Sequence, residues 1–452
     1  MTTLLTLRDR SLPDRSTAAS RKLLLPIFSL SAMLVLACGD KNTSPIHWVW
    51  AGGITENAFR VTTKLRSPSD DVRLLVSSGE NLAEAVAILP TPRKDSDPLV
   101  NAFDVNDLQP STTYRYGIEV NGIVAAEQLG EIRTLTPGPF SFKFAFGSCA
   151  RTGSNSSLFE QIQQHDPLLF LHLGDFHYED IEENDPDKYR DAYDEVLTSP
   201  TQSALYRSTA VEYVWDDHDF GPNNSDSTHE GRGAAQTVYR EVVPHRQLLD
   251  DEAIYRAFTI GRARFIVTDS RSYKTDRYLP DTPEKSVLGT QQKAWLQEEL
   301  LAANGQYPLI FWVSTMPWIA EADGDADHWG GYTHERLEIS QFIEDNDIRG
   351  LVMLSGDAHM LAIDDGSNNR FTPNGGPGFP VMHAAALDKN GSEKGGPYSE
   401  GVFEGGGQFG LVTVDDDGSD TVRVLLSGRN KEGEELVGLR LEFPVLPIPE
   451  AE

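Results

Sequence analysis

The chain has 452 residues, which exceeds one ordinary domain and suits two or three. Apolar residues make up 39% and charged residues 24%, so collagen-like, multi-span membrane and mostly disordered proteins are excluded. With 39 Lys and Arg against 69 Asp and Glu, the net charge of -30 argues against a nucleic-acid partner or unaided binding to anionic lipid. The two cysteines, Cys38 and Cys149, cannot form a disulfide framework, so they pair once or have separate roles.

The first 40 residues are typical of a secretory signal. Basic residues precede an uncharged run over 23–37, which is shorter than the roughly 20 residues of a bilayer span. The run ends in Val-Leu-Ala-Cys, which resembles a bacterial lipobox and predicts a lipid anchor on Cys38. The alternative is a plain signal peptide with Cys38 discarded or free. Both predict an exported protein, and the first places it on a membrane, in the periplasm or at the cell surface.

The remaining chain divides into a linker over 38–45, a first domain over 46–137 and a second over 138–448. Alternating β-rich runs separated by turn-rich segments predict a β-sandwich for the first domain. Residues 108–116, Leu-Gln-Pro-Ser-Thr-Thr-Tyr-Arg-Tyr, resemble the fibronectin type III pattern, an immunoglobulin-like sandwich in which a tyrosine closes a corner. No catalytic spacing occurs here, which favours a structural or spacing role.

In the second domain, short apolar runs alternate with helical segments, which predicts an α/β domain. Such sheets bind ligands where the strands end, so six strand ends are expected to converge on one site. The expected strands are 142–146, 168–173, 212–215, 263–268, 309–314 and 350–355, and the expected helices are 158–164, 188–197, 233–249, 291–303 and 335–344. Strands near 408–414, 421–427 and 436–443 complete the sheets.

Polar residues that can bind metals follow these runs. Each has an ordinary alternative, because Asp often caps helices, a buried His is often structural, and Cys149 alone would be a small core residue. Together they gather more charge than a core tolerates without cations. The clusters are Gly-Ser-Cys-Ala-Arg at 147–151, Gly-Asp-Phe-His-Tyr-Glu-Asp at 174–180, Asp-Asp-His-Asp at 216–219, Asp-Ser-Arg at 269–271 and Gly-Asp-Ala-His at 356–359.

These motifs resemble the alkaline phosphatase D family of the metallophosphoesterase superfamily. The resemblance covers roughly residues 45 to 440, and Trp-Asp-Asp-His-Asp-Phe-Gly-Pro-Asn-Asn followed by Ser-Gly-Asp-Ala-His is its specific part. It implies two mixed sheets packed face to face with helices outside. It also implies a calcium-dependent phosphomonoesterase or phosphodiesterase with Fe³⁺ beside the Ca²⁺.

The resemblance implies a role for each motif residue. Asp175 would bridge the two metals, while Cys149, Tyr178 and His359 would bind iron. Asp357, placed two residues before His359 on the same face of an extended segment, would bind the second metal together with Asp217, Asn223 or both. Thiolate, phenolate and imidazole suit a transition metal, whereas carboxylate and amide oxygens suit Ca²⁺.

The resulting prediction is an exported hydrolase that releases phosphate from phosphomonoesters, and from diesters in one variant of the hypothesis. A water held between two cations would attack phosphorus, and His218 would donate a proton to the leaving group or hold the phosphate. Arg151 and Arg271 are candidate phosphate clamps, with ion pairs as the alternative for each. Two other functions stay open: a phosphodiesterase or phospholipase acting on nucleotides or lipid headgroups, and a non-catalytic calcium-binding lipoprotein.

Overall fold

The computed structural model describes residues 44–93 and 96–445, and these belong to one compact unit. The predicted signal over 1–37 and the predicted lipid anchor at Cys38 lie outside the described residues. Within the described residues the strands form sheets of nine, seven and five strands. No helix there is long and apolar enough to cross a bilayer.

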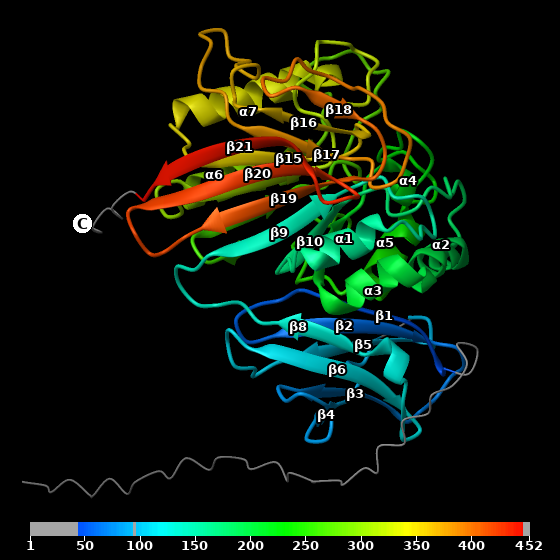
Figure 1. The fold of residues 1–452 in the computed structure, drawn as a ribbon. Helices are drawn as coiled ribbons and strands as arrows, with labels where there is room; N and C mark the ends of the chain where they lie inside the picture. The colour runs from blue at the N-terminus through cyan, green and yellow to red at the C-terminus, as the bar shows by residue number, and fades with distance from the viewer. Residues whose placement is uncertain (1–43, 94–95, 446–452) are drawn as a thin grey trace, which may run out of the picture. The chain divides into compact units, whose positions relative to one another are not determined.

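The N-terminal strands form two facing layers, at the lower end of Figure 1. Phe59 of one layer packs against Tyr114 and Tyr116 of the other, with ring centroids 6.4 and 6.1 Å apart. The Tyr114 hydroxyl accepts a hydrogen bond from the backbone N–H of Gln109 at 2.8 Å, within the segment that resembles the fibronectin pattern. One layer holds β1 (Ile46–Gly52), β2 (Phe59–Leu65) and β5 (Val100–Val105); the other holds β3 (Val72–Ser77), β4 (Val86–Ile88), β6 (Thr113–Val120), β7 (Ile123–Val124) and β8 (Gly130–Arg133), with the 3-10 helix η1 (Ala126–Gln128) before β8.

The layer of β1, β2 and β5 continues into the nine-stranded sheet, because Gly52 of β1 lies opposite Val211 in a parallel pairing. The order of this sheet is β21-β20-β19-β9-β10-β11-β1-β2-β5. Its remaining strands are β9 (Phe142–Gly147), β10 (Leu169–Leu173), β11 (Ala210–Val214), β19 (Gln408–Asp415), β20 (Thr421–Asn430) and β21 (Glu435–Pro444).

The seven-stranded sheet has the order β12-β13-β14-β15-β17-β16-β18, with β13, β14, β15 and β17 parallel. All six residues of Leu309–Ser314 are buried, as expected of a strand covered on both faces. The strands are β12 (Arg256–Ile260), β13 (Ala263–Val267), β14 (Leu309–Ser314), β15 (Leu351–Ser355), β16 (Met360–Asp364), β17 (Val381–Ala384) and β18 (Val402–Glu404).

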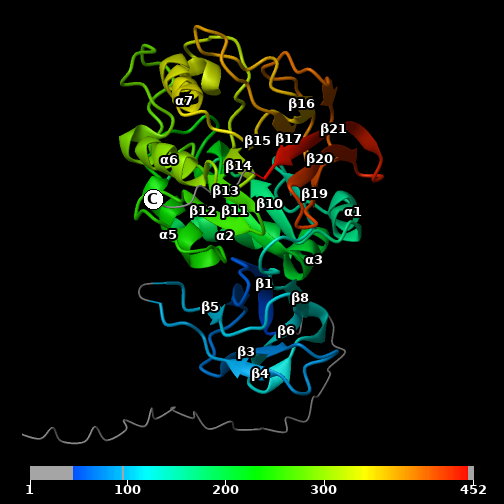
Figure 2. The same ribbon diagram turned by 90° about the vertical axis from the view of Figure 1, so that its left-hand side faces the viewer.

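The nine- and seven-stranded sheets pack face to face through aromatic side chains. Phe144 of β9 meets Phe265 and Phe311 of the seven-stranded sheet edge-on, with centroids 5.4 and 5.2 Å apart. Residues at alternate positions, such as Trp312, point to the other face and join the cluster of the covering helices. Figure 2 shows helices outside both sheets. They are α1 (Leu158–Gln164), α2 (Pro186–Thr198), α3 (Pro200–Ser208), α4 (Asp217–Phe220), α5 (Arg232–Val242), α6 (Gly289–Ala303), η2 (Trp329–Gly331) and α7 (Thr333–Asp345).

All six predicted strands of the second domain are present, and their ends differ from the prediction by two residues at most. The predicted helix over 233–249 is wrong at its C-terminal end. It stops at Val242, because Pro244 disfavours helical backbone at the residue before it. The sequence reading also missed α3 and the single turn of α4, which lies inside the Asp-Asp-His-Asp motif.

A glycine allows the ends of β10 and β11 to approach each other. Gly174 has φ +88°, and a Cβ placed there would lie 2.3 Å from Cβ of Asp216. We expect Gly174→Ala to lower the free energy of unfolding by about 3 kcal/mol or more, measured by urea denaturation. Gly122 is the control, since it has φ +77° and open space around its position, and Gly122→Ala should cost about 1 kcal/mol. Equal losses would contradict the steric explanation.

Candidate metal centre

The candidate ligands lie on loops that follow strands of both sheets. Cys149 follows β9, Asp175 follows β10, and Asp357 and His359 follow β15. All four have positive φ, at 64°, 52°, 61° and 48° respectively. Non-glycine residues rarely adopt this conformation, which costs on the order of 1–3 kcal/mol each and concentrates at functional sites. The surrounding structure therefore holds these loops against their own backbone preference.

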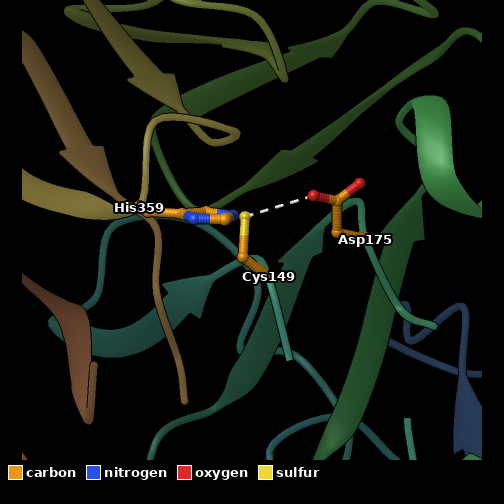
Figure 3. A group of neighbouring side chains, drawn as sticks. All are labelled: Cys149, Asp175 and His359. Carbon is orange, nitrogen blue, oxygen red and sulfur yellow. Dashed lines mark hydrogen bonds between the residues drawn. The ribbon is translucent and has the colours of Figure 1, made fainter. Parts of the chain in front are cut away.

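A first group joins Cys149, Asp175 and His359, whose potential ligand atoms lie within 4.8 Å of one another. Figure 3 shows the three side chains converging from separate loops. Asp175 Oδ2 accepts hydrogen bonds from Cys149 Sγ at 3.3 Å and from the Tyr178 hydroxyl at 2.7 Å. That hydroxyl also lies 3.1 Å from His359 Nε2. The structure thus brings together all four residues predicted to surround the iron.

Two further groups extend the first. Asp175, Asp217 and His218 form one of them, and Asp216, Asp217 and Asp357 form the other, again with potential ligand atoms within 4.8 Å. Asp175 is shared between the first and second groups, and Asp217 between the second and third. The side chains therefore form a continuous cluster, with sulfur, phenol and imidazole at one end and carboxylates at the other.

The cluster has the unsatisfied oxygens that a cation site requires. Among the described residues, one carboxylate oxygen each of Asp175, Asp216, Asp217 and Asp357 is buried without a hydrogen-bond partner. Burial, and then the neighbouring carboxylates Asp217, Asp219 and Asp357, raise the pKa of Asp175 well above its usual range. Burial, and then Asp175 and Asp357, likewise raise the pKa of Cys149. These groups ionise together only with added positive charge, so the donor set fits bound cations.

Arg271 supplies part of that positive charge from within the protein. It is fully buried; its Nε donates to Asp216 at 2.5 Å and its Nη1 to Asp327 at 2.7 Å. Its Nη2 lies 3.8 Å from Asp217. Burial alone would raise the pKa of Asp217, but Arg271 and then His218 outweigh burial and hold that pKa below its usual range. The contacts favour the ion-pair alternative for Arg271 over a phosphate clamp, because its donors face carboxylates and its side chain is closed to solvent.

Some residues of the Asp-Asp-His-Asp motif hold neighbouring loops together, and the others belong to the cluster of potential ligands. Asp219 accepts from the backbone N–H groups of Phe176 at 3.0 Å and Asp216 at 2.7 Å, so it ties together the loops after β10 and β11. Asp216 Oδ1 accepts from the Thr315 hydroxyl at 2.9 Å, which connects β11 to the loop after β14. Asp217 and His218 belong to the cluster itself.

His218, Arg151 and Asn223 lie at the solvent side. His218 is half-buried, and its Nδ1 lies 2.5 Å from Asp180 Oδ1, which fixes the orientation of the ring. Arg151 is exposed and donates from Nη2 to Asn390 at 3.2 Å. Asn223 is also exposed, and the backbone N–H of Asn224, not the Asn223 side chain, reaches Asp217 Oδ2 at 2.6 Å. Asn223 as a ligand stays a prediction.

The predicted extended segment at Asp357 and His359 is wrong. Asp357 and His359 do not lie on an extended segment, because both have left-handed backbone. The loop instead sends the two side chains to different groups, His359 to Cys149 and Asp357 to Asp216 and Asp217. An alternating pattern would have kept both side chains on one face of a strand.

The sequence reading missed two lysines in the loop between β17 and β18. Lys389 Nζ lies 3.3 Å from the centre of the Tyr178 ring, and Lys394 Nζ donates to Asp357 Oδ1 at 2.8 Å. Burial opposes the charge on Lys394, yet Asp357 and then Asp217 raise its pKa above the usual range. No motif marks either residue, because the loop is rich in glycine and charge and its position depends on the tertiary fold.

Two mixed sheets packed face to face, with metal-competent side chains where their strands end, define the metallophosphoesterase class. Residues 144–394, more than half of the chain, match the PhoD-like phosphatase family, and the chain belongs to that family. It is 24% identical over 317 residues to alkaline phosphatase D of Bacillus subtilis (strain 168). That match spans 57% of this chain and 52% of the relative, about half of the relative's length.

Two solved structures share the fold. A structure of PhoD superposes with a TM-score of 0.70 at 18% sequence identity, covering 90% of this chain and 92% of that one. Purple acid phosphatase PPD1 from yellow lupin (Lupinus luteus) seeds superposes with a TM-score of 0.58 at 14% identity, covering 87% and 73%. The shared architecture is the mixed arrangement of sheets with helices outside.

The assignment of Arg271 to the carboxylates can be tested by removing its charge. Arg271→Met would leave Asp216, Asp217 and Asp327 buried without this partner. We expect the free energy of unfolding of the metal-free protein to fall by about 3–5 kcal/mol in urea denaturation. Arg423→Met is the control, because Arg423 pairs with Glu442 at the surface and should contribute less than about 1 kcal/mol. Unchanged stability with a raised KM for a phosphate ester would instead identify a phosphate clamp.

Proposed function

We propose that the protein is a metal-dependent hydrolase of phosphoric esters that releases phosphate from phosphomonoesters. The observation that carries the proposal is the position of Asp175, which is shared by the group with Cys149 and His359 and the group with Asp217 and His218. A single carboxylate between two donor sets is the arrangement that holds two cations close together. Membership of the PhoD-like phosphatase family supports the same reaction class.

Fe³⁺ and Ca²⁺ are the cations that the donor types favour. Cys149, Tyr178 and His359 would hold the iron, since thiolate, phenolate and imidazole suit transition metals. Asp217 and Asp357 would hold the calcium through hard carboxylate oxygens, and Asp175 would lie between the two. Bound there, the two cations would make a water nucleophilic near neutral pH and neutralise charge on the phosphoryl oxygens.

The other side chains near the cluster would bind the substrate and move protons. His218 is held by Asp180 through Nδ1, which leaves Nε2 to donate a proton to the departing alkoxide. Arg151 is exposed, and among the residues that the structure describes Asn390 contacts only one of its terminal nitrogens, so its guanidinium can bind a phosphoryl oxygen at the entrance. Ser148 Oγ accepts from the N–H of Asp357 at 3.2 Å and keeps the loops after β9 and β15 in register.

Hydrolysis of a chromogenic phosphomonoester and of its diester tests the proposal. The purified protein should turn over the monoester with iron and calcium supplied, and a chelator should abolish turnover. Asp175→Asn should lower kcat/KM by roughly a thousandfold or more, because the carboxylate common to two groups is lost. Asp347→Asn is the matched control, since Asp347 also has positive φ but pairs with Arg349 at the surface.

The outcomes separate the remaining functions. Faster turnover of the diester would favour the phosphodiesterase alternative. If neither ester is hydrolysed with both metals present, while calcium still binds, the protein is a calcium-binding protein and the enzyme proposal fails.

The iron assignment has an optical test. Thiolate or phenolate bound to Fe³⁺ absorbs visible light through charge transfer, so the protein should be coloured and contain about one iron per chain by element analysis. Tyr178→Phe or Cys149→Ser should shift or remove the band. Tyr189→Phe is the control, because Tyr189 is buried but bonded to the backbone carbonyl of Phe220. A colourless, iron-free and fully active protein would refute the iron assignment.

A further inference from the structure

Lys394 places a positive charge directly on a carboxylate of the candidate metal centre. Its Nζ donates to Asp357 Oδ1 at 2.8 Å, and the Asp357 side chain is only 8% exposed. The other oxygen, Oδ2, is buried and has no hydrogen-bond partner among the described residues. The Asp357 carboxylate is therefore divided between a lysine on one oxygen and an unsatisfied position on the other.

The ammonium shares its carboxylate with the position of the second cation. Asp357 oxygens lie within 4.8 Å of carboxylate oxygens of Asp216 and Asp217. One buried oxygen of each of these three residues is unsatisfied, so a divalent cation bound there would face the Lys394 charge across a single carboxylate. Two positive charges on opposite sides of one carboxylate repel each other strongly when they are partly shielded from water.

The side chain of Lys394 can leave without disturbing the fold. It is 41% exposed and lies in a segment without regular secondary structure. The backbone on either side is held, because the Ser392 N–H donates to the His359 carbonyl at 3.1 Å and the Gly396 N–H to the Ile319 carbonyl at 2.8 Å. Four side-chain carbons of lysine allow the ammonium to turn towards solvent while this loop stays in place.

We propose that Lys394 is a tethered cation that pairs with Asp357 when the second metal position is vacant and competes with a divalent cation for that carboxylate. A divalent cation must then exceed a threshold concentration to displace the ammonium from Asp357. Below that threshold, the ammonium compensates part of the buried negative charge. This inference rests on the proposed function, since it takes Asp357 as a ligand of the second cation.

Calcium binding to the metal-stripped full chain, followed by isothermal titration calorimetry at pH 8, tests the inference. Lys394→Met should bind Ca²⁺ roughly fivefold or more tightly than the unsubstituted chain, because the competing charge is gone. Lys394→Gln should do the same, and Lys394→Arg should stay within about twofold because it keeps the charge. Circular dichroism confirms that each variant is folded.

Lys293→Met is the matched control. Lys293 pairs with Glu338 at 2.6 Å on the helices outside the seven-stranded sheet, and its loss should leave the calcium affinity unchanged. Unchanged or weaker affinity in both Lys394→Met and Lys394→Gln overturns the inference, as does equal tightening in Lys293→Met.

Asp357→Asn separates failure of the inference from failure of the proposed function. If this variant binds Ca²⁺ more weakly while the Lys394 variants do not differ from the unsubstituted chain, the metal site stands and only the inference fails. If the unsubstituted chain shows no saturable Ca²⁺ binding and Asp357→Asn is identical to it, the calcium site fails, and the inference fails with it.

Discussion

The structure depends on how it tolerates buried negative charge where its two main sheets meet. Asp175, Asp216, Asp217, Asp219 and Asp357 are all almost fully buried, in segments that follow strands of both sheets. Moving one carboxylate out of water is costly, and placing several together adds repulsion. The carboxyl groups of such a site ionise together only if positive charge enters it. Arg271, Lys394 and the proposed metal ions are the sources of that charge, and they differ in how freely they can leave.

The backbone around the site follows from this constraint. An extended segment would keep the side chains of Asp357 and His359 on one face, whereas their left-handed backbone sends them to different groups of the same cluster. Close contact between the sheets also restricts which residue can occupy a position. A Cβ on Gly356 would lie 2.7 Å from the Leu173 carbonyl oxygen, so the two sheets meet over a residue without a side chain. The left-handed backbone of the ligand residues and the need for glycine at position 356 therefore both follow from the close approach of the two sheets at the site.

The sequence was most informative where local pattern and chemistry coincide. The apolar runs predicted the strands well because a strand buried on both faces needs continuous hydrophobicity, as in Leu309–Ser314. The ligand types were also visible, because Cys149, Asp175 and Tyr178 directly follow two such runs. The sequence could not show that Asp357 and His359 diverge, since a positive φ at a non-glycine residue is imposed by tertiary contacts. The sequence also could not show whether Arg271 binds phosphate or pairs with carboxylates, because the answer depends on whether its side chain is buried.

The positively charged groups of the site differ in how firmly the protein holds them. This difference matters because the chain as a whole is strongly negative. A protein with a net charge of -30 repels phosphate esters unless its site is locally positive. Arg271 is buried and bonded to carboxylates, so it lowers the negative charge of the site without facing the substrate. Lys394 is partly exposed and, among the described residues, pairs with the side chain of Asp357 alone, so in our proposal it can give up its position. Under the proposed function, the attraction for an anionic ester would then come from bound metal together with the exposed Arg151, so substrate binding as well as chemistry would depend on the cation supply.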